Sequence, residues 1–464
     1  MRKFLVLLAA TLVVSACGGG GDSVTGVVGG GGQPAACSND GQKQFVLDVL
    51  YDWYLWNDLL PANINISDYA SPEELVFEVT TTFGPKDANG NPLDRFSSVG
   101  SLMADQQFFG EGKYEGFGFS WREENDEMRI TRVFEGSPAG LGLLARGQHV
   151  DRLNGRTYLD IRANEGVSAF FDANETVTFS LRRPDTSTFE TVVTQDIVTI
   201  DPVPQARIID MGAGAPPVGY FEFRTFISTA HDGQPHDGVN DRDFDAVFAS
   251  FIAAGVRDVV IDMRYNGGGL VDTAELLGDY LGGFANDGLV FSETEYNADR
   301  NVEFTEEQRK SFFSRLGNSL DIQRFIVVAS RSTASASELV VNSLAPYADV
   351  WVVGDNTFGK PVGQVGIPFC EDRILRPTSF RTKNAAGFSD YFDGLPVDCP
   401  AQDLLDIPIG ADNDPNLVAA LSISSTGACP VAATPPGAQA AEIATDIVLP
   451  EVRGDTAREL ANAW

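Results

Sequence analysis

At residues 258–269 the chain reads DVVIDMRYNGGG. The mostly apolar residues at 258–263 predict a strand that is buried on both faces, as in a parallel sheet. The glycines at 267–269 predict a tight turn, because glycine adopts backbone conformations that other residues avoid. A helical pattern follows over residues 270–281. This stretch therefore predicts one strand, loop and helix unit of an α/β fold.

The same alternation of strand and helix recurs from about residue 215 onward. Further strands are predicted at residues 218–226, 325–330 and 350–354, and further helices at residues 244–254 and 336–344. Repeated units of this kind form a mainly parallel sheet with helices on its faces. We therefore predict an α/β core within residues 201–464.

Three of the predicted strands are followed by loops that carry polar residues or glycines. The loops read NGGG at 266–269, STASASE at 332–338 and TFGKPVGQ at 357–364. In parallel α/β sheets, ligands bind outside the carboxyl ends of the strands. Because neighbouring strands would bring the three loops together, we expect a functional site there.

The residue types in these loops suit acyl transfer. Ser335 would begin a helix, where free backbone N–H groups and the helix dipole can stabilise an oxyanion. Lys360 could accept the serine proton as a neutral amine if burial lowers its pKa, and Gln364 could orient that amine. The histidines are all far from the serine loop in sequence, at His149, His231 and His236. A lysine base is therefore favoured over a Ser-His-Asp triad.

Each loop also has an ordinary structural interpretation. Ser335 and Glu338 form the S-x-x-E pattern of a helix capping box. Gly267 to Gly269 can serve a tight turn alone, and Lys360 can be a solvated loop lysine. Only the combination of the three loops favours catalysis over these alternatives.

The motifs resemble those of the C-terminal processing peptidases, also called tail-specific proteases. The shared features are SASE at 335–338, FGK at 358–360, a glutamine four residues after the lysine, and DMRYNGGG at 262–269. Lys360 lies 25 residues after Ser335, which is the family spacing. Departures are Met263 and Tyr265 in the glycine loop and Pro361 after the lysine. The resemblance covers about residues 100–410.

The resemblance implies a ClpP/crotonase-like catalytic core and a role for each site residue. Ser335 would be the nucleophile, Lys360 the general base and Gln364 its orienter. The backbone N–H groups of Gly268 and Ala336 would form the oxyanion hole. Ser337 would be a second serine without a catalytic role.

Residues 95–200 predict a series of short strands joined by turns, and they resemble a PDZ domain. The matching segments are Ser137-Pro138-Ala139 and Leu153-Asn154-Gly155, whereas Gln148-His149 departs from the usual Gly-Asp. A PDZ domain binds a peptide as an added strand and holds its C-terminal carboxylate on backbone N–H groups. The predicted peptide-binding loop is Gly116, Phe117, Gly118 and Phe119, although the two phenylalanines more commonly serve as core residues.

The N-terminus predicts export and lipid anchoring. Arg2 and Lys3 precede an apolar run at residues 4–14, which is typical of a signal peptide. LVVSAC at 12–17 resembles a bacterial lipobox, so residues 1–16 would be removed and Cys17 acylated; an ordinary signal peptide is the alternative. Gly18 favours outer-membrane sorting. Residues 17–36 would be a glycine-rich tether, and the predicted location is the bacterial cell envelope.

Residues 37–94 predict a helical block. Apolar residues over 45–56 recur with helical spacing, and Pro61 should end that helix. Ser71 and Pro72, followed by two glutamates, have the pattern of a second helix start.

Charge and cysteine usage limit the partners. The formal net charge of −32 argues against nucleic acid. Exported cysteines can form disulfides, and we favour pairing Cys370 with Cys399 and Cys37 with Cys429. Cysteine spacing does not fit a zinc knuckle and the histidines are scattered, so we expect no metal and no cofactor.

The sequence therefore predicts a serine endopeptidase that acts on extracytoplasmic proteins, with protein or peptide substrates captured through their C-termini. A non-catalytic peptide-binding scaffold on the same fold and a non-peptidase esterase or amidase are the alternatives.

Overall fold

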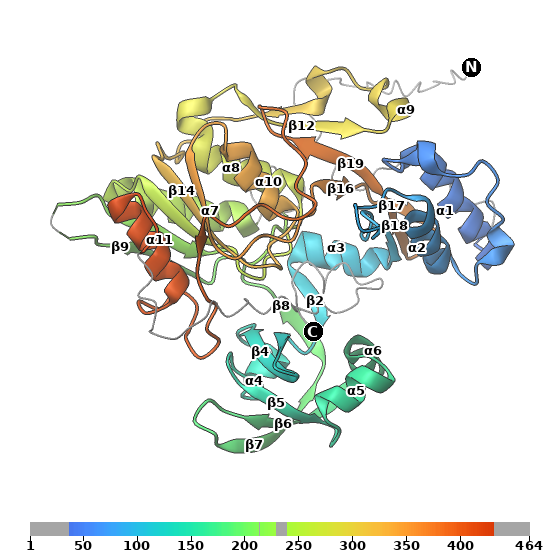
Figure 1. Ribbon diagram of the computed structural model, residues 1–464, viewed down its shortest axis with the longest axis horizontal. Helices are drawn as coiled ribbons and strands as arrows, with labels where there is room; N and C mark the ends of the chain where they lie inside the picture. Colours follow the sequence, from blue (N-terminus) through green and yellow to red (C-terminus); the bar gives the residue numbers. More distant parts are fainter. Residues whose placement is uncertain (1–36, 213, 229–238, 431–464) are drawn as a thin grey trace, which may run out of the picture.

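A computed structural model describes residues 37–212, 214–228 and 239–430 (Figure 1). The predicted signal peptide, Cys17 and the tether lie outside the described residues, as do His231 and His236. In the part of the chain that is described, no helix combines the length and the apolar character needed to span a bilayer. Export and lipid anchoring therefore stay predictions.

The core is a six-stranded sheet with the order β20-β15-β14-β11-β10-β9. Its strands are β9 (Gln205–Ile209), β10 (Val218–Glu222), β11 (Asp258–Asp262), β14 (Arg324–Ala329), β15 (Asp349–Gly354) and β20 (Cys399–Pro400). All neighbours are parallel except β9, which runs antiparallel to β10. The predicted strands and the mainly parallel sheet are confirmed.

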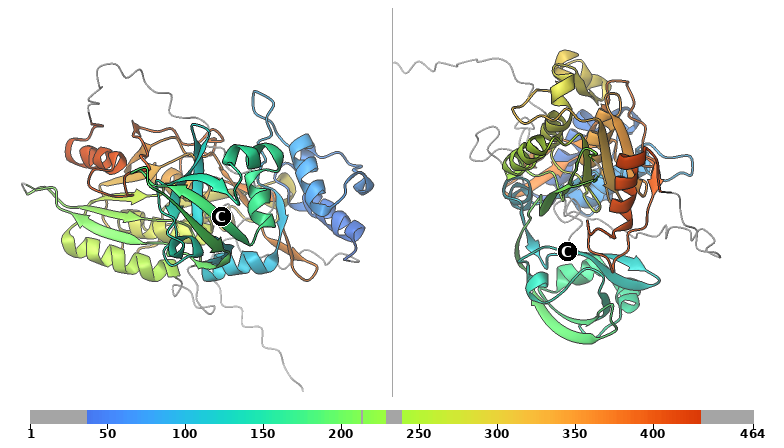
Figure 2. Two further views of the ribbon diagram at one scale, coloured as in Figure 1. Left: turned by 90° about the horizontal axis from the view of Figure 1, so that it is seen from below. Right: turned by 90° about the vertical axis from the view of Figure 1, so that its left-hand side faces the viewer.

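Helices cover both faces of this sheet. The helices on one face are α7 (Val239–Ala254), α8 (Val271–Asn286) and α10 (Ala336–Leu344), and the opposite face carries α11 (Pro415–Thr426). Val259 and Ile261 of β11 face the first layer, whereas Val260 between them faces α11. The right-hand view of Figure 2 shows α11 and α7 on opposite sides of the sheet. This alternation explains why the strand is apolar at consecutive positions.

One residue of α8 should make stability depend on pH. Burial, reinforced by the Asp272 carboxylate, raises the pKa of Glu275 from 4.5 to about 8. The folded chain therefore binds this proton more tightly than the unfolded chain, so the free energy of unfolding falls as pH rises between these values. Glu275→Gln should raise that free energy by roughly 1–2 kcal/mol at pH values above 8 and change it little near pH 4. Urea unfolding at both pH values measures this, and an equal gain from the exposed Glu78→Gln would contradict it.

A second unit is built around a five-stranded sheet in which all neighbouring strands are antiparallel. Its sheet has the order β3-β4-β5-β6-β7. The elements are β3 (Phe119–Glu124), β4 (Glu127–Val133), α4 (Pro138–Leu141), β5 (His149–Leu153), α5 (Tyr158–Asn164), α6 (Val167–Ala173), β6 (Thr176–Arg182) and β7 (Thr188–Thr194). We call these elements and their connecting loops the β-rich unit. The predicted series of short strands and turns is confirmed, and the PDZ assignment stays a prediction.

The β-rich unit is attached to the rest of the chain through a two-stranded stem. Strands β2 (Lys113–Gly116) and β8 (Asp196–Thr199) pair antiparallel, so the chain enters and leaves the unit side by side. Figure 1 shows the unit below the core, joined at this stem.

Two smaller sheets connect the core to the N-terminal helices. Their orders are β1-β18-β17 and β13-β12-β19-β16. Their strands are β1 (Ser98–Gly100), β12 (Val290–Tyr296), β13 (Lys310–Phe312), β16 (Val362–Gln364), β17 (Ile367–Phe369), β18 (Arg373–Arg376) and β19 (Thr378–Lys383). Two helices, α3 (Leu102–Glu111) and α9 (Ala298–Asn301), follow β1 and β12 in the chain.

The N-terminal helices are α1 (Asn39–Trp53) and α2 (Pro72–Phe83). They pack on the small sheets, and the rings of Phe45 and Phe369 stack at 4.9 Å. The predicted start of α2 is confirmed, because Ser71 Oγ accepts from Glu74 N–H at 3.2 Å. The predicted end of the first helix at Pro61 is wrong. Tyr54 is extended and the next N–H, of Leu55, donates to the Thr378 carbonyl at 2.8 Å, so the chain leaves the helix to contact β19.

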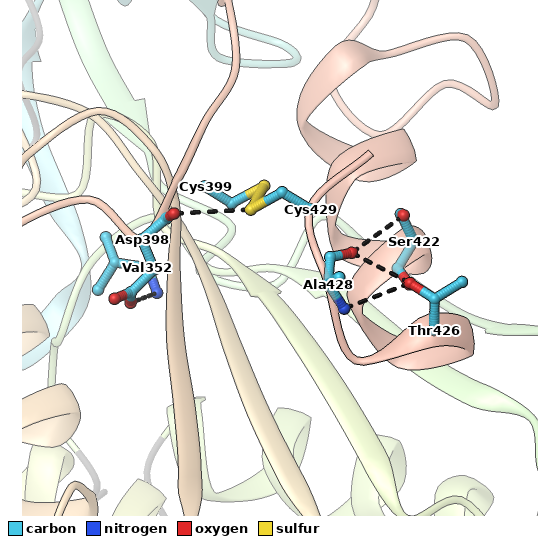
Figure 3. The surroundings of a disulfide bond; sticks show 7 residues. All are labelled: Val352, Asp398, Cys399, Ser422, Thr426, Ala428 and Cys429. Carbon is cyan, nitrogen blue, oxygen red and sulfur yellow. Dashed lines mark hydrogen bonds between the residues drawn. A yellow bond between two sulfur atoms is a disulfide. The ribbon is translucent and has the colours of Figure 1, made fainter. Parts of the chain in front are cut away.

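The structure pairs the cysteines differently from our prediction. Cys37 bonds to Cys370 with 5.8 Å between their Cα atoms, and Cys399 bonds to Cys429 with 5.6 Å. Cys370 follows β17, in the small sheet against which α1 packs. Cys399 lies on β20 of the core sheet, beside the segment that follows α11 (Figure 3). The predicted Cys370–Cys399 pair is wrong because these two cysteines belong to different sheets, although they flank one segment of sequence.

Candidate active site

The three loops meet at the carboxyl edge of the core sheet, as expected. The Ala334 N–H donates to the Asn266 carbonyl at 3.0 Å, which joins the loops after β11 and β14. The Phe358 N–H donates to the Thr333 carbonyl at 2.9 Å, which joins the loops after β14 and β15. The parallel order β15-β14-β11 places all three loops side by side.

Ser335 lies at the N-terminus of α10 in a strained backbone conformation. Its φ is +57° and its ψ is −116°, a combination that ordinarily favours glycine. The side chain is half-buried between the buried Ala334 and Ala336. A strained serine at a turn from strand to helix is a known way to present a nucleophilic hydroxyl. The positive end of the helix dipole adds favourable electrostatics for a developing anion.

Glu338 joins the serine loop to the lysine loop. One carboxylate oxygen accepts from the N–H groups of Ser335 at 2.9 Å and Lys360 at 2.8 Å. The other accepts from the Gly359 N–H at 2.7 Å and from the Thr357 hydroxyl. Burial raises the pKa of this carboxyl, and the four donors oppose that rise. The sequence predicted only the capping contact with Ser335, so the link to the lysine loop was missed.

Lys360 and Gln364 contact each other directly. The Lys360 Nζ donates to Gln364 Oε1 at 2.8 Å. The Gln364 Nε2 donates to the carbonyls of Phe96 at 2.6 Å and Arg376 at 3.0 Å. Because two carbonyls fix the amide nitrogen, the amide oxygen must face the lysine.

Phe96 contributes to this part of the site in a second way. Its ring centre lies 4.8 Å from the Lys360 Nζ, so the ring packs directly against the amine. Phe96 precedes β1 and is more than 200 residues away from the lysine in sequence. No local sequence pattern indicates this contact.

Gly268 packs directly against the serine loop. Its φ is +102°, and a Cβ atom there would lie 2.7 Å from the Ala334 carbonyl oxygen and 2.8 Å from the Ser335 Cβ. Both conformation and space therefore require glycine. The Gly268 N–H donates to Asn266 Oδ1 at 2.9 Å, so in this structure it caps the turn instead of facing a substrate oxygen. Within the described residues the Ala336 N–H has no protein acceptor. The Ala336 N–H is therefore available to a substrate oxygen, whereas the Gly268 N–H is bound to Asn266 in this structure.

Ser337 is separated from the site by its own hydrogen bond. Its side chain is fully buried and its Oγ donates to the Asn266 carbonyl at 3.1 Å. This arrangement agrees with a structural role for the second serine of the motif.

A buried ionic cluster lies behind the glycine loop. Asp403 accepts from Arg264 at 2.8 Å and from Arg146 of the β-rich unit at 2.5 Å, and it also accepts from the Tyr265 hydroxyl. From β4 of the same unit, Arg132 donates to the Arg264 carbonyl at 2.8 Å. Tyr265 has a φ of +65° and directly precedes the glycine loop. The β-rich unit therefore braces the residues that enter this loop. No local pattern identified Asp403, which lies between the bonded cysteines Cys399 and Cys429.

Removing the charge of Asp403 should loosen this brace. Burial acts to raise the pKa of Asp403, but the guanidinium groups of Arg264, Arg146 and Arg122 hold it well below its ordinary value. The stability gained from this carboxylate is therefore present at neutral pH and lost as pH falls through its ordinary value of 3.8 and below. Asp403→Asn should lower the free energy of unfolding by about 2 kcal/mol at pH 7.

The same substitution should lower peptide cleavage by about tenfold, since misplaced catalytic groups slow the chemical step. The matched control is Asp406→Asn, because Asp406 pairs with Arg129 of the same unit at 2.8 Å but is largely exposed. Unfolding curves and cleavage rates measure both effects. Equal effects of the two substitutions would contradict a specific role for Asp403.

The predicted peptide-binding loop lies between the stem and the β-rich unit. Gly116 ends β2, whereas Phe117 and Phe119 are buried in the core of the unit. Gly118 has a φ of +87° and packs against Ser137. The two phenylalanine side chains are therefore core residues. Strand β3 lies at the edge of its sheet, where a peptide strand could add.

No metal site emerges among residues 37–212, 214–228 and 239–430, where no group of His, Cys, Asp and Glu could hold an ion. His149 lies on β5 in the β-rich unit, with its Nδ1 2.6 Å from Glu127.

Comparisons with known proteins agree with this arrangement. Residues 217–396 match the model of peptidase family S41, and residues 41–98 match the peptidase S41 N-terminal domain. The chain is 24% identical over 291 residues to the carboxy-terminal-processing protease of Bartonella bacilliformis, covering 62% of this chain and 61% of that protein. It is 22% identical over 276 residues to the carboxy-terminal processing protease CtpA of Bacillus subtilis, covering 59% and 53%. The matches thus span about half to three fifths of these relatives.

The fold has a solved counterpart. A crystal structure described as an S41 protease from Bacteroides fragilis superposes with a TM-score of 0.64 at 22% identity, covering 83% of this chain and 97% of that one. The chain therefore belongs to peptidase family S41 and is homologous to carboxy-terminal processing proteases.

Proposed function

We propose that the chain is a serine endopeptidase in which Ser335 is the nucleophile, Lys360 the general base and Gln364 the residue that orients the base. One observation carries this proposal: a single buried carboxylate, of Glu338, binds the backbone of both Ser335 and Lys360, while Gln364 holds the amine. A solvated loop lysine would need neither contact. Family membership supports a peptidase, and the positions of these residues support the catalytic pair.

The chemistry follows from these positions. As the Ser335 Oγ bonds to the substrate carbonyl carbon, its proton passes to the neutral Lys360 amine. The protonated amine then gives that proton to the leaving nitrogen as the peptide C–N bond breaks. Water, activated by the same amine, hydrolyses the acyl-enzyme and restores the serine. The Ala336 N–H and the dipole of α10 stabilise the oxyanion, and Gly268 joins them if its N–H leaves Asn266.

The proposed substrates are extracytoplasmic proteins or peptides. The signal-peptide and lipobox patterns support an anchored envelope protein, and the names of the relatives support processing at C-termini. The β-rich unit would capture the C-terminus by strand addition at β3.

The test is digestion of unfolded casein by the purified chain, followed by mass spectrometry of the products. An endopeptidase yields internal fragments that are lost in Ser335→Ala. A peptide-binding scaffold yields none, and an esterase hydrolyses a simple ester without cutting casein. Because Lys360 must be neutral to act, cleavage should slow as pH falls. A rate that stays constant down to about pH 5 would argue against a lysine base.

A further inference from the structure

Two arginines lie at the edge of the candidate active site. Arg95 is exposed, and its guanidinium lies 5.0 Å from the ring centre of Phe358 and 5.6 Å from that of Phe96. These rings contact each other edge-on, with their centres 6.2 Å apart. Lys360 lies against the ring of Phe96. Arg95 is thus separated from the candidate base by one aromatic ring.

Arg331 reaches the same place from the serine loop. It lies four residues before Ser335 and donates to the carbonyls of Thr357 at 3.1 Å and Asp393 at 3.3 Å. Thr357 directly precedes Phe358, so the two guanidinium groups contact consecutive residues of the lysine loop. Partial desolvation of its guanidinium and then the Arg331 charge lower the pKa of Arg95, which agrees with two cations close together.

The pair is unusual for this chain. The chain carries 65 acidic and 33 basic residues, and most described arginines form ion pairs with carboxylates. Within the described residues neither Arg95 nor Arg331 does so, and Arg331 binds only neutral carbonyls. Asp87 and Asp393 act on Arg95 only as more distant charges. Two cations therefore lie next to the catalytic loops without a carboxylate of the described residues paired to either.

We propose that Arg95 and Arg331 form a subsite that binds a carboxylate of the substrate next to the bond to be cleaved. The proposal rests on the proposed peptidase function and adds a substrate preference to it. The carboxylate is an acidic side chain or the free C-terminus of the peptide. Arg95 can supply a charge-assisted contact from a ring-stacked position, and Arg331 adds a second positive charge. The overall charge of −32 repels anionic peptides, so a preference for a carboxylate must arise locally.

Peptide binding to the Ser335→Ala variant tests the subsite without cleavage. The probes are four fluorescein-labelled unstructured decapeptides with otherwise neutral side chains. One has a free C-terminus and one is its C-terminal amide. The other two are amides that carry a central Glu or a central Gln. At least one carboxylate peptide should bind about tenfold more tightly than its neutral partner, and the pair that differs identifies the source of the carboxylate.

Adding Arg95→Gln should reduce this preference to about twofold or less, because a neutral amide gives weaker hydrogen bonds to an anion. Among the described residues the Arg95 side chain contacts aromatic rings and has no hydrogen-bond partner, so its loss should not disturb the fold. Arg331→Gln is the second variant. The matched control is Arg183→Gln, since Arg183 also stacks on a phenylalanine, 4.0 Å from the ring centre of Phe189, but lies in the β-rich unit.

Equal binding of carboxylate and neutral peptides, or a preference that survives Arg95→Gln, would overturn the subsite. The subsite would also be overturned if Arg183→Gln reduced the carboxylate preference as much as Arg95→Gln does. Because the readout is binding, the outcome is independent of catalysis. Failure of casein cleavage would remove the peptidase proposal and leave the binding result to be judged separately.

Discussion

Ser335→Ala is expected to lower kcat/KM for unfolded casein by roughly 10⁴-fold or more, because the proposed reaction has no other nucleophile at this position. The fold should be preserved. The substitution removes one half-buried hydroxyl, and the backbone contacts that hold the loop, from the Ser335 N–H to Glu338 and from Leu339 to the Ser335 carbonyl, stay available. Cleavage rates and the thermal unfolding midpoint measure the two properties.

Ser337→Ala is the matched control, because the same motif supplies a second serine two residues later. Ser337 is fully buried, and its Oγ donates to the Asn266 carbonyl of the glycine loop. Its loss should cost about 1 kcal/mol of stability, since a buried carbonyl loses a partner. Cleavage should stay within about threefold of the original rate, as expected when no reacting group is removed. If Ser337→Ala were inactive and Ser335→Ala active, the nucleophile would be Ser337, and the proposed assignment would be wrong.

The features that could be predicted from the sequence are those with local patterns. Apolar runs such as residues 259–261 indicate parallel strands, because burial on both faces favours apolar side chains at consecutive positions. The convergence of the three loops follows from strand direction alone, and the motif spacing then singles out Ser335 and Lys360. The start of α10 at Ala336 could likewise be predicted from the sequence, because Ser335 and Glu338 form a capping pattern there.

The features that were missed depend on contacts between distant residues. Phe96 reaches Lys360 only after the small sheets have formed, and Asp403 meets Arg146 across the boundary of two units. The cysteine pairing was wrong for the same reason, since Cys370 follows a strand of a small sheet whereas Cys399 lies in the core sheet. The Asn266 contact of Gly268 is different. It is local, but a glycine loop can point its N–H groups in several directions, and the sequence does not choose among them.

Glu338→Gln is expected to have the second largest effect, because it breaks the link between the two catalytic loops. The carboxylate accepts from four donors on the serine and lysine loops. An amide offers one acceptor oxygen, and its NH₂ group would face two of these donors. Two buried donors would lose their partner, at about 1–3 kcal/mol each, so the free energy of unfolding should fall by about 2–4 kcal/mol.

Activity should fall further than stability alone explains. If the loops shift apart by about 1 Å, kcat should fall by roughly 100-fold, while KM should change little because the binding surfaces remain. A purely structural role predicts instead a normal kcat for the fraction that is folded. Measuring kcat and KM at a temperature where the variant is fully folded separates the two cases.

Glu74 provides a matched control for the capping contact. It follows Ser71 by three residues at the start of α2, as Glu338 follows Ser335, and it accepts from the Ala70 N–H. It lies on the surface and touches neither catalytic loop, so Glu74→Gln should cost at most about 1 kcal/mol and leave kcat unchanged. If Glu338→Gln behaved like Glu74→Gln, the buried glutamate would be only a helix cap, and another contact would have to hold Lys360 beside the serine loop.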